Sequence, residues 1–213
     1  MARRLRKRIS GLITLKRFIY LISPNEIKRK FYENLENVLS YGNVKFFQLR
    51  VKKLRKKNLI KIKKKIRKIT QKHKVKLIIN DDYSLVPKIG ADGCHMGQGD
   101  GSFIIARKKL KKKVLGITCH DSIILAKKAL KFKPDYLAFG SFFKSKLKPS
   151  AKIANLRILK EVRNIKKPIV VIGGINNLNY KKLLKLGAKY IALSSFIWDN
   201  PKLKPKIAIR KFK

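Results

Sequence analysis

Apolar residues along the chain fall into two alternating kinds of pattern. Short runs such as 75–79 are continuously apolar and rich in β-branched residues, which is typical of a strand covered on both faces. Between such runs, apolar residues recur at spacings of three and four, most clearly at Leu59, Ile62, Ile66 and Ile69. This spacing predicts one apolar stripe along a helix whose other faces carry lysines. The chain therefore reads as strands and helices in alternation.

Eight strand-length runs are each followed by sequence long enough for a helix. We predict strands at 18–23, 45–50, 75–79, 93–96, 114–118, 136–139, 169–172 and 190–193. Besides the helix around Ile62, we predict helices at 24–39, 122–131, 154–162 and 179–186. The first of these is expected to begin near Pro24, because proline is favoured in the first turn of a helix.

A weak internal repeat supports a parallel sheet. Segments 88–97, 133–140 and 186–194 each read as the end of a helix, a tight turn and a short strand. Repeated units of this kind favour parallel strands joined by right-handed crossovers. An open doubly wound sheet is the competing fold, but no GxGxxG motif follows the first strand. We predict a single (β/α)8 TIM barrel over residues 18–213, preceded by a basic N-terminal arm at 1–17.

The composition is strongly basic. The 213 residues include 56 Lys and Arg but only 11 Asp and Glu, which gives a formal net charge of +45. Such a charge suggests a protein that binds nucleic acid or a membrane surface. The lysines are spread over the polar faces of nearly all predicted helices, however, and no nucleic-acid recognition motif accompanies them. We favour a lysine-rich enzyme with no specific nucleic-acid partner and no membrane partner.

Cysteine content and the N-terminal region bear on the compartment. Cys94 and Cys119 are the only cysteines, too few for a disulfide framework, and neither lies in a CxxC motif. The apolar run at 18–23 is too short to span a membrane and is followed by Pro24 instead of a small-residue cleavage site. We expect a cytoplasmic protein. The sequence leaves open a homo-oligomer, which would have to bury a less charged surface.

Polar residues and glycines gather where the predicted strands end, which in a barrel is the face that carries the active site. They are Gln48, Arg50, Lys52, Asn80, Asp81, Asp100, Thr118, His120, Ser145, Lys148, Gly174, Ser194 and Ser195. Arg and Lys donate charge-assisted hydrogen bonds to phosphoryl oxygens, and glycines let backbone amides approach a phosphate. Carboxylates bind Mg²⁺ together with substrate phosphates. The set predicts a phosphate and metal site.

Asp81 and Asp100 are the expected Mg²⁺ ligands. The chain has only eleven acidic residues, so two of them at strand ends favour a functional role over an incidental placement. A helix-capping role for Asp81 stays open at this point. Asp82 is expected to cap the following helix and Asp92 to serve the Ala-Asp-Gly turn.

Six ordered segments carry a family resemblance over residues 18–197. They are FQLRVK (47–52), LIIND (77–81), ADGCHMGQGD (91–100), LGITCH (115–120), VIGGI (171–175) and ALSS (192–195). In this order they resemble thiamine-phosphate synthase. That family joins a hydroxymethylpyrimidine diphosphate to a thiazole phosphate and releases diphosphate, which the resemblance implies for this chain.

The resemblance also implies roles for the strand-end residues. Asp81 and Asp100 would hold Mg²⁺, and Asn80 would contact the pyrimidine substrate. The diphosphate would be bound by Gln48, Arg50, Lys52 and Lys148. The thiazole phosphate would be bound by Gly174, Ser194 and Ser195, with Ser145 from the neighbouring loop. Thr118 stands where the family usually has serine and keeps the hydroxyl.

One loop departs from the family pattern. The family usually has Thr-x-Thr-Lys after the sixth strand, where this chain has Ser145-Lys146-Leu147-Lys148. Leu147 cannot donate to a phosphate, and one lost hydrogen bond costs about 1–3 kcal/mol. The departure predicts weaker binding of the thiazole phosphate.

Two alternative functions remain. One is a thiazole tautomerase of the same fold, in which a histidine near this motif acts in proton transfer, and His120 would be that residue here. Our candidate catalytic residues are His120 and, from the diphosphate side, Lys148. The diphosphate-binding residues and the carboxylate pair argue against that branch. The second alternative is a non-catalytic barrel that binds polyanions through its charge. His73 is expected to be solvated, and His95 to be a packed, hydrogen-bonded imidazole.

Overall fold

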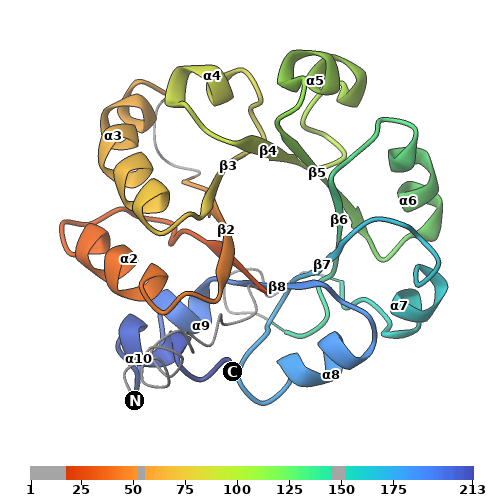
Figure 1. Ribbon diagram of the computed structural model, residues 1–213. Coiled ribbons are helices and arrows are strands. Elements are labelled where there is room, and N and C mark those ends of the chain that lie inside the picture. Colours follow the sequence, from red (N-terminus) through yellow and green to blue (C-terminus); the bar gives the residue numbers. More distant parts are fainter. Residues whose placement is uncertain (1–17, 52–55, 145–151) are drawn as a thin grey trace, which may run out of the picture.

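A computed structural model of the protein describes residues 18–51, 56–144 and 152–213. Its strands form a closed barrel in the order β1 to β8, and every pair of neighbours is parallel, including β8 with β1. Figure 1 looks along the barrel axis, with the helices arranged as an outer ring. The predicted single (β/α)8 barrel is confirmed. The N-terminal arm at 1–17 lies outside the described residues and stays a prediction.

The strands and helices alternate along the chain as the apolar pattern predicts. The strands are β1 (Ile19–Ile22), β2 (Val44–Leu49), β3 (Lys76–Asn80), β4 (Gly93–Met96), β5 (Val114–His120), β6 (Tyr136–Phe139), β7 (Ile169–Val171) and β8 (Tyr190–Leu193). The helices are α2 (Phe31–Leu39), α3 (Lys56–Lys72), α4 (Leu85–Ile89), α5 (Phe103–Leu110), α6 (Ile123–Leu130), α7 (Arg157–Glu161), α8 (Tyr180–Lys185), α9 (Ser195–Trp198) and α10 (Pro205–Ile209). Within the described ranges, none of these helices is long and apolar enough to cross a membrane.

The start of the first helix is the main correction to the expected elements. The prediction placed it near Pro24, but α2 begins at Phe31. The buried residues of α2 are Phe31, Leu35, Val38 and Leu39, and this helical spacing does not extend back to Pro24. The preference of proline for the first turn of a helix did not determine where α2 begins, because most of a helix's stability in a protein comes from burying an apolar face.

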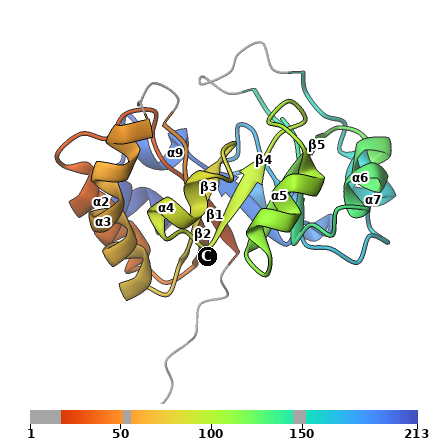
Figure 2. The same ribbon diagram turned by 90° about the horizontal axis from the view of Figure 1, so that it is seen from above.

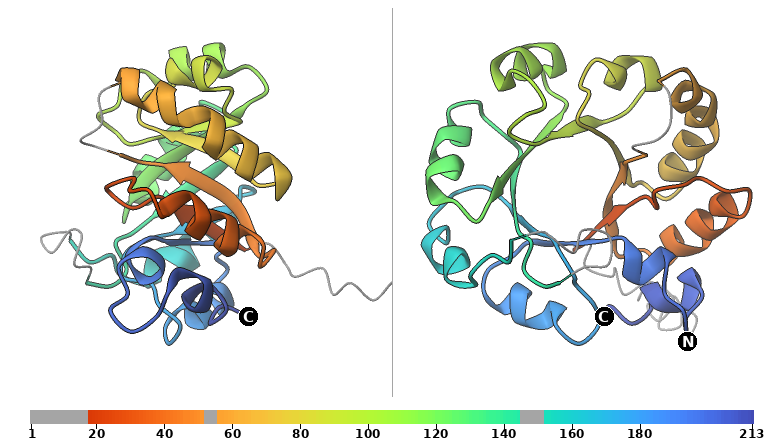
Figure 3. Two further views of the ribbon diagram at one scale, coloured as in Figure 1. Left: turned by 90° about the vertical axis from the view of Figure 1, so that its left-hand side faces the viewer. Right: turned by 180° about the vertical axis from the view of Figure 1, so that it is seen from behind.

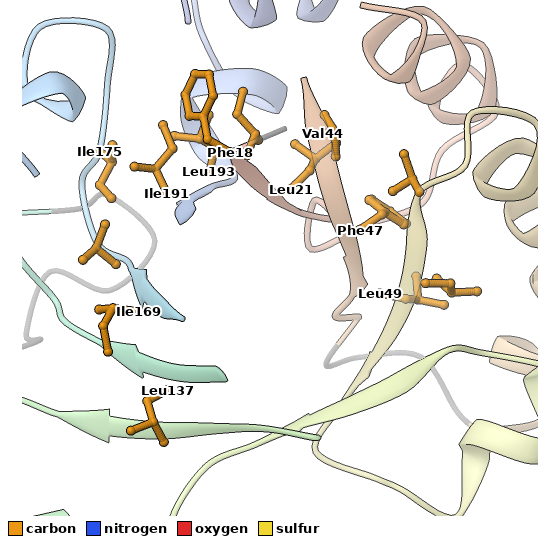
Figure 4. Close-up of a cluster of buried hydrophobic side chains, with 14 of the residues drawn as sticks. Phe18, Leu21, Val44, Phe47, Leu49, Leu137, Ile169, Ile175, Ile191 and Leu193 are labelled. Carbon is orange, nitrogen blue, oxygen red and sulfur yellow. The ribbon is translucent and has the colours of Figure 1, made fainter. Parts of the chain in front are cut away.

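Alternation along each strand divides the apolar core into two layers. Outward-facing residues such as Leu21, Phe47 and Ile191 join the buried faces of the helices in one large cluster. Figure 4 shows part of this outer layer. Figures 2 and 3 show the helices packed around the side of the barrel. Helix α10 contacts both α2 and α9. The ring of helices is thereby continuous across the junction of the first and last strands.

The inner layer fills the barrel with side chains from alternate strand positions. It contains four aromatic residues, Tyr20, Phe46, Tyr136 and Tyr190. The Tyr136 ring occupies space next to Gly116, where an added Cβ would lie 2.0 Å from Tyr136 Cζ. A large ring on one strand is therefore matched by a glycine on its neighbour.

Two aspartates stabilise the amino-terminal end of the barrel in the same way. Asp92, just before β4, accepts from the Leu77 backbone amide at 2.7 Å and pairs with both terminal nitrogens of Arg67. Asp135, just before β6, accepts from the Leu115 amide at 2.8 Å and from Arg107 at 3.0 Å. The expected turn role of Asp92 was incomplete, because its carboxylate binds a neighbouring strand and helix. Both aspartates lie in the repeat segments noted in the sequence.

We expect Asp92→Asn to lower the free energy of unfolding by about 1–2 kcal/mol, because it weakens a two-point bond with Arg67 and a charged bond to Leu77. Asp199→Asn is the matched control, since Asp199 is exposed and its carboxylate makes no bond to a described residue. Urea unfolding of both variants measures the difference. Equal stability of the two would contradict the role given to Asp92.

Candidate active site

The carboxyl ends of β3 and β4 bring Asp81 and Asp100 to the same rim. The two strands are paired neighbours, with Asn80 opposite His95, and the Asp81 amide donates to the His95 carbonyl at 2.8 Å. Asp81 holds a φ of 65°, a left-handed conformation that aspartate tolerates better than most residues. Asp100 lies in the turn after β4, where its Oδ2 accepts from the Gly97 amide at 2.6 Å.

The charges of three carboxylates act on the buried Cys94 thiol. Burial raises the pKa of the Cys94 thiol, and the negative charges of Asp81, Asp82 and Asp100 raise it further. Asp82 has the local role expected of it, because its Oδ1 accepts from the Ser84 amide just before α4. Asp81 follows β3 and Asp100 lies in the turn after β4, so both belong to the carboxyl end of the barrel.

The donor set suits a metal that shares its ligands with a substrate. Among the described residues, no three His, Cys, Asp or Glu side chains gather closely enough to enclose a metal ion by themselves. Mg²⁺ is usually held by one or two carboxylates and completes its shell with water and phosphate oxygens. Two neighbouring carboxylates therefore fit Mg²⁺ bound together with a phosphorylated ligand.

Arg50 and Gln48 come from the end of β2, beside β3. The Arg50 backbone is fixed by the buried Ser23, whose hydroxyl accepts from the Arg50 amide at 2.9 Å and donates to its carbonyl at 3.1 Å. The Gln48 side chain is only 2% exposed, and its Nε2 donates to Tyr20 Oη at 3.2 Å. The expected contact of Gln48 with a diphosphate stays a prediction, and the structure adds a bond inside the barrel.

His95 and Thr118 face the interior from β4 and β5. His95 Nε2 lies 2.8 Å from Thr118 Oγ1, and His95 Nδ1 lies 3.0 Å from Tyr136 Oη. Burial lowers the pKa of His95 to about 4, with a smaller lowering by Arg50 that is opposed by Asp100. The expectation of a packed, hydrogen-bonded imidazole at His95 is confirmed.

His120 ends β5 at the barrel opening. Its imidazole has no described partner that would orient it towards a bound ligand. The residue follows an irregularity in β5, is exposed, and has a φ of 53°. Its carbonyl accepts from the Gly140 amide at 2.9 Å, whereas its imidazole makes no hydrogen bond to a described residue. The observed contact is the support of a neighbouring loop.

Loops after β6, β7 and β8 form the other side of the opening. An added Cβ at Gly174 would lie 2.3 Å from the Lys144 carbonyl oxygen, so this glycine lets the loop after β6 pack closely. Within the described part of the chain, the backbone amides of Gly174 and Ser195 have no hydrogen-bond acceptor. Amides of this kind, at a glycine turn and at the start of a short helix, suit an anion. The Ser194 hydroxyl donates to the Ser23 carbonyl at 3.2 Å.

Three predicted site residues lie outside the described ranges, and several other residues have hydrogen-bonding roles that were not predicted. Lys52, Ser145 and Lys148 lie outside the described residues, so their roles stay predictions. Sequence reasoning missed the hydrogen-bonding roles of Tyr20 and Tyr136, although both occupy inward positions of their strands. It also missed the bonds of the Ser23 hydroxyl to the Arg50 backbone and the link between Gln98 Nε2 and the Thr118 carbonyl at 2.5 Å.

Comparisons with known proteins agree with this geometry. The family model described as thiamine monophosphate synthase matches residues 19–197. A thiamine-phosphate synthase of Pelagibacter ubique is 54% identical over 93% of this chain and 97% of its own, and one of Erythrobacter litoralis is 37% identical over 85% and 88%. The solved structure of a thiamine phosphate pyrophosphorylase from Pyrococcus furiosus has a TM-score of 0.81 at 26% identity, covering 93% of this chain and 95% of that one.

We expect the His95 ring to titrate with a midpoint near pH 4, because burial disfavours its charged form. Histidine NMR titration measures this midpoint, and His73→Gln and His120→Gln variants assign the His95 signals. The unfolded chain binds this proton with a pKa of about 6.5, so His95 lowers the free energy of unfolding as the pH falls from about 6.5 towards 4. A His95 midpoint at or above 6.5 would contradict its burial as a neutral ring.

Proposed function

The chain belongs to the thiamine monophosphate synthase family, and we propose that it uses Mg²⁺ at Asp81 and Asp100 to join hydroxymethylpyrimidine diphosphate to a thiazole phosphate, with release of diphosphate. Its activity is that of a thiamine-phosphate synthase, a transferase. The metal, the leaving group and the individual residue roles are the proposed part.

One observation carries this proposal: the two carboxylates occupy neighbouring strand ends with a cation beside them. Asp81 and Asp100 follow β3 and β4, and Arg50 follows β2, which pairs with β3. The negative charge of Asp100 raises the pKa of His95 and the positive charge of Arg50 lowers it, so both charges act on one ring. A diphosphate needs this combination, because a divalent cation and an arginine together neutralise its charge.

Asp81 and Asp100 would hold the metal through carboxylate oxygens. When bound, Mg²⁺ supplies positive charge that stabilises phosphoryl oxygens as a diphosphate leaves. Gly97 contributes by fixing the Asp100 carboxylate through its amide. This bond would hold one of the two proposed metal ligands in position before substrate binds.

The reaction exchanges one bond for another at the pyrimidine methylene carbon. The C–O bond to the diphosphate breaks with its electron pair on the leaving group, and the thiazole nitrogen then forms a C–N bond to the same carbon. Arg50, with Lys52 and Lys148 by family resemblance, stabilises the charge that develops on the diphosphate. Exclusion of water protects the electron-poor carbon from hydrolysis. No protein nucleophile is required.

The thiazole phosphate would bind across the opening, at the ends of β7 and β8. The amides of Gly174 and Ser195, which bond no acceptor among the described residues, support this assignment, as does the four-residue helix α9 that begins at Ser195. Barrel enzymes often bind phosphate with the loops after their seventh and eighth strands and a short extra helix. Leu147 lies outside the described residues, and its weakening effect on this half-site stays a prediction.

The alternative functions are not favoured. A tautomerase would have no use for a carboxylate pair beside Arg50, and the exposed His120 ring has no described partner that would orient it for proton transfer. A polyanion-binding barrel would not require the strand-end residues of the site. The relatives reported above carry the name of the synthase.

We expect Asp81→Asn and Asp100→Asn each to lower the rate of thiamine phosphate formation by about 100-fold or more and to raise the Mg²⁺ concentration needed for half-maximal rate. Initial rates over a Mg²⁺ titration measure both effects. Asp199→Asn, an exposed aspartate-to-asparagine change outside the site, is the control and should retain the wild-type rate. Wild-type Mg²⁺ dependence in either site variant would contradict the assignment of that aspartate as a Mg²⁺ ligand.

We expect Gly174→Ala to raise the KM for the thiazole phosphate by at least about tenfold, because the new Cβ would meet the Lys144 carbonyl and displace the loop after β6. The KM for the pyrimidine diphosphate should change much less. Gly42→Ala is the control, since Gly42 also has a positive φ of 88° but has open space around it at the other end of the barrel. Equal changes in both KM values would argue against separate half-sites.

A further inference from the structure

Five side chains are hydrogen-bonded in series across the interior of the barrel. Gln48 Nε2 lies 3.2 Å from Tyr20 Oη, and Tyr20 Oη lies 2.7 Å from Tyr136 Oη. Tyr136 Oη lies 3.0 Å from His95 Nδ1, and His95 Nε2 lies 2.8 Å from Thr118 Oγ1. Each member comes from a different strand: β2, β1, β6, β4 and β5. We call this set the interior series.

The interior series runs from the core towards the opening. Gln48, Tyr20 and Tyr136 are 2%, 2% and 1% exposed, whereas His95 and Thr118 are only partly buried. Buried hydroxyl and amide groups are costly unless they are bonded, so the inner three members need one another. His95 and Thr118 are the members of the series with the larger exposed fractions.

Packing fixes the middle of the series. The rings of His95 and Tyr136 are stacked, with centroids 5.7 Å apart and an interplanar angle of 7°. The Tyr136 ring also fills the space that a side chain at Gly116 would take. Neither ring is therefore free to turn away from the bond between Tyr136 Oη and His95 Nδ1.

The amide of Gln48 sets the direction of the hydrogen bonds. Its Nε2 only donates, so Tyr20 Oη accepts this bond. Among the described residues Tyr136 is the one other partner of Tyr20 Oη, so the single hydroxyl hydrogen of Tyr20 is bonded only if it is directed to Tyr136. Tyr136 also has one hydroxyl hydrogen, which it then donates to His95 Nδ1. Every bond in the buried part of the series points towards the opening.

This direction determines the state of the last two members. An imidazole whose Nδ1 accepts is neutral and carries its proton on Nε2, which donates to Thr118 Oγ1. Thr118 Oγ1 is thus an acceptor for His95, and its own hydroxyl hydrogen has no acceptor among the described residues. The series ends in an oriented donor at the rim of the barrel.

We propose that Tyr20 and Tyr136 are positioning residues, which act through His95 to present Thr118 as a hydrogen-bond donor to the pyrimidine ring of the substrate. The ligand class rests on the proposed function. A pyrimidine ring nitrogen has a lone pair and only accepts, so it matches an oriented hydroxyl hydrogen. The tyrosines contact neither substrate nor metal. They favour binding of the pyrimidine ring because they fix the direction of the hydrogen bond that Thr118 donates to it.

The first test needs no substrate and uses the intact protein. Selective ¹⁵N labelling of histidine and NMR at neutral pH report which ring nitrogen of His95 carries the proton, with the His73→Gln and His120→Gln variants for assignment. We expect protonated Nε2 and unprotonated Nδ1, and a shift towards protonated Nδ1 in Tyr136→Phe. Protonated Nδ1 in the wild-type protein would reverse the series and overturn the inference.

The second test separates positioning from a general structural role. Tyr136→Phe keeps the ring and removes only the hydroxyl, and we expect it to raise the KM for the pyrimidine diphosphate about tenfold with little change in kcat or in the KM for the thiazole phosphate. Tyr190→Phe removes a hydroxyl from the same inner layer but outside the series, and should leave all three constants unchanged. Tyr20→Phe provides a second variant of the same kind.

A double-mutant cycle with Thr118→Val decides whether Tyr136 acts through Thr118. If it does, the double variant has no higher KM for the pyrimidine diphosphate than Thr118→Val alone. Multiplicative effects of the two substitutions, or an unchanged KM in Tyr136→Phe, would overturn the inference. Absence of thiamine phosphate formation by the wild-type protein would instead overturn the proposed function, and the NMR result would still decide the direction of the series.

Discussion

The pairing of the first strand with the last is the constraint on which the site depends. Residues 19–21 of β1 pair with residues 191–193 of β8, which closes the barrel. Ser23, just beyond β1, bonds the Arg50 backbone on one side and accepts from the Ser194 hydroxyl on the other. Trp198 Nε1 adds a bond of 2.6 Å to the Ile22 carbonyl. Closure therefore joins the proposed diphosphate side of the opening to the proposed phosphate side.

Charge is distributed with a clear division between the two ends of the barrel. Asp92 and Asp135 are bonded to arginines and strand amides at the amino-terminal end, where they stabilise the fold. Asp81 and Asp100 lie at the carboxyl end, close to the buried Cys94 thiol. The chain has a net charge of +45, and the lysines on its exposed faces also favour the approach of anionic substrates.

Much of the fold and half of the site were predictable because they are local in sequence. The strands at 93–96, 136–139 and 190–193 have the predicted bounds, since short apolar runs next to turns define them. The position of Asp81 and Asp100 at one end of the barrel was predictable, because Asp81 directly follows β3 and Asp100 lies in the turn after β4. The start of α2 at Phe31 was missed, because proline preference was weighed above the spacing of buried residues.

The unpredicted features depend on contacts between distant parts of the chain. The hydroxyls of Tyr20 and Tyr136 are 116 residues apart in sequence, and only barrel closure and the gap at Gly116 bring them together. The bonds of Asp92 to Arg67 and Leu77 likewise cross to a neighbouring helix and strand. Apolar periodicity marks such positions as inward or outward but does not say which of them meet.

Product analysis tests the central claim most directly. The wild-type protein is incubated with hydroxymethylpyrimidine diphosphate, the thiazole phosphate and Mg²⁺, and thiamine phosphate and free diphosphate are measured over time. The account predicts that the two products appear in equal amounts and that chelation of the metal stops both. Thiamine phosphate formed at full rate without a divalent metal, or no thiamine phosphate at saturating substrates, would contradict it.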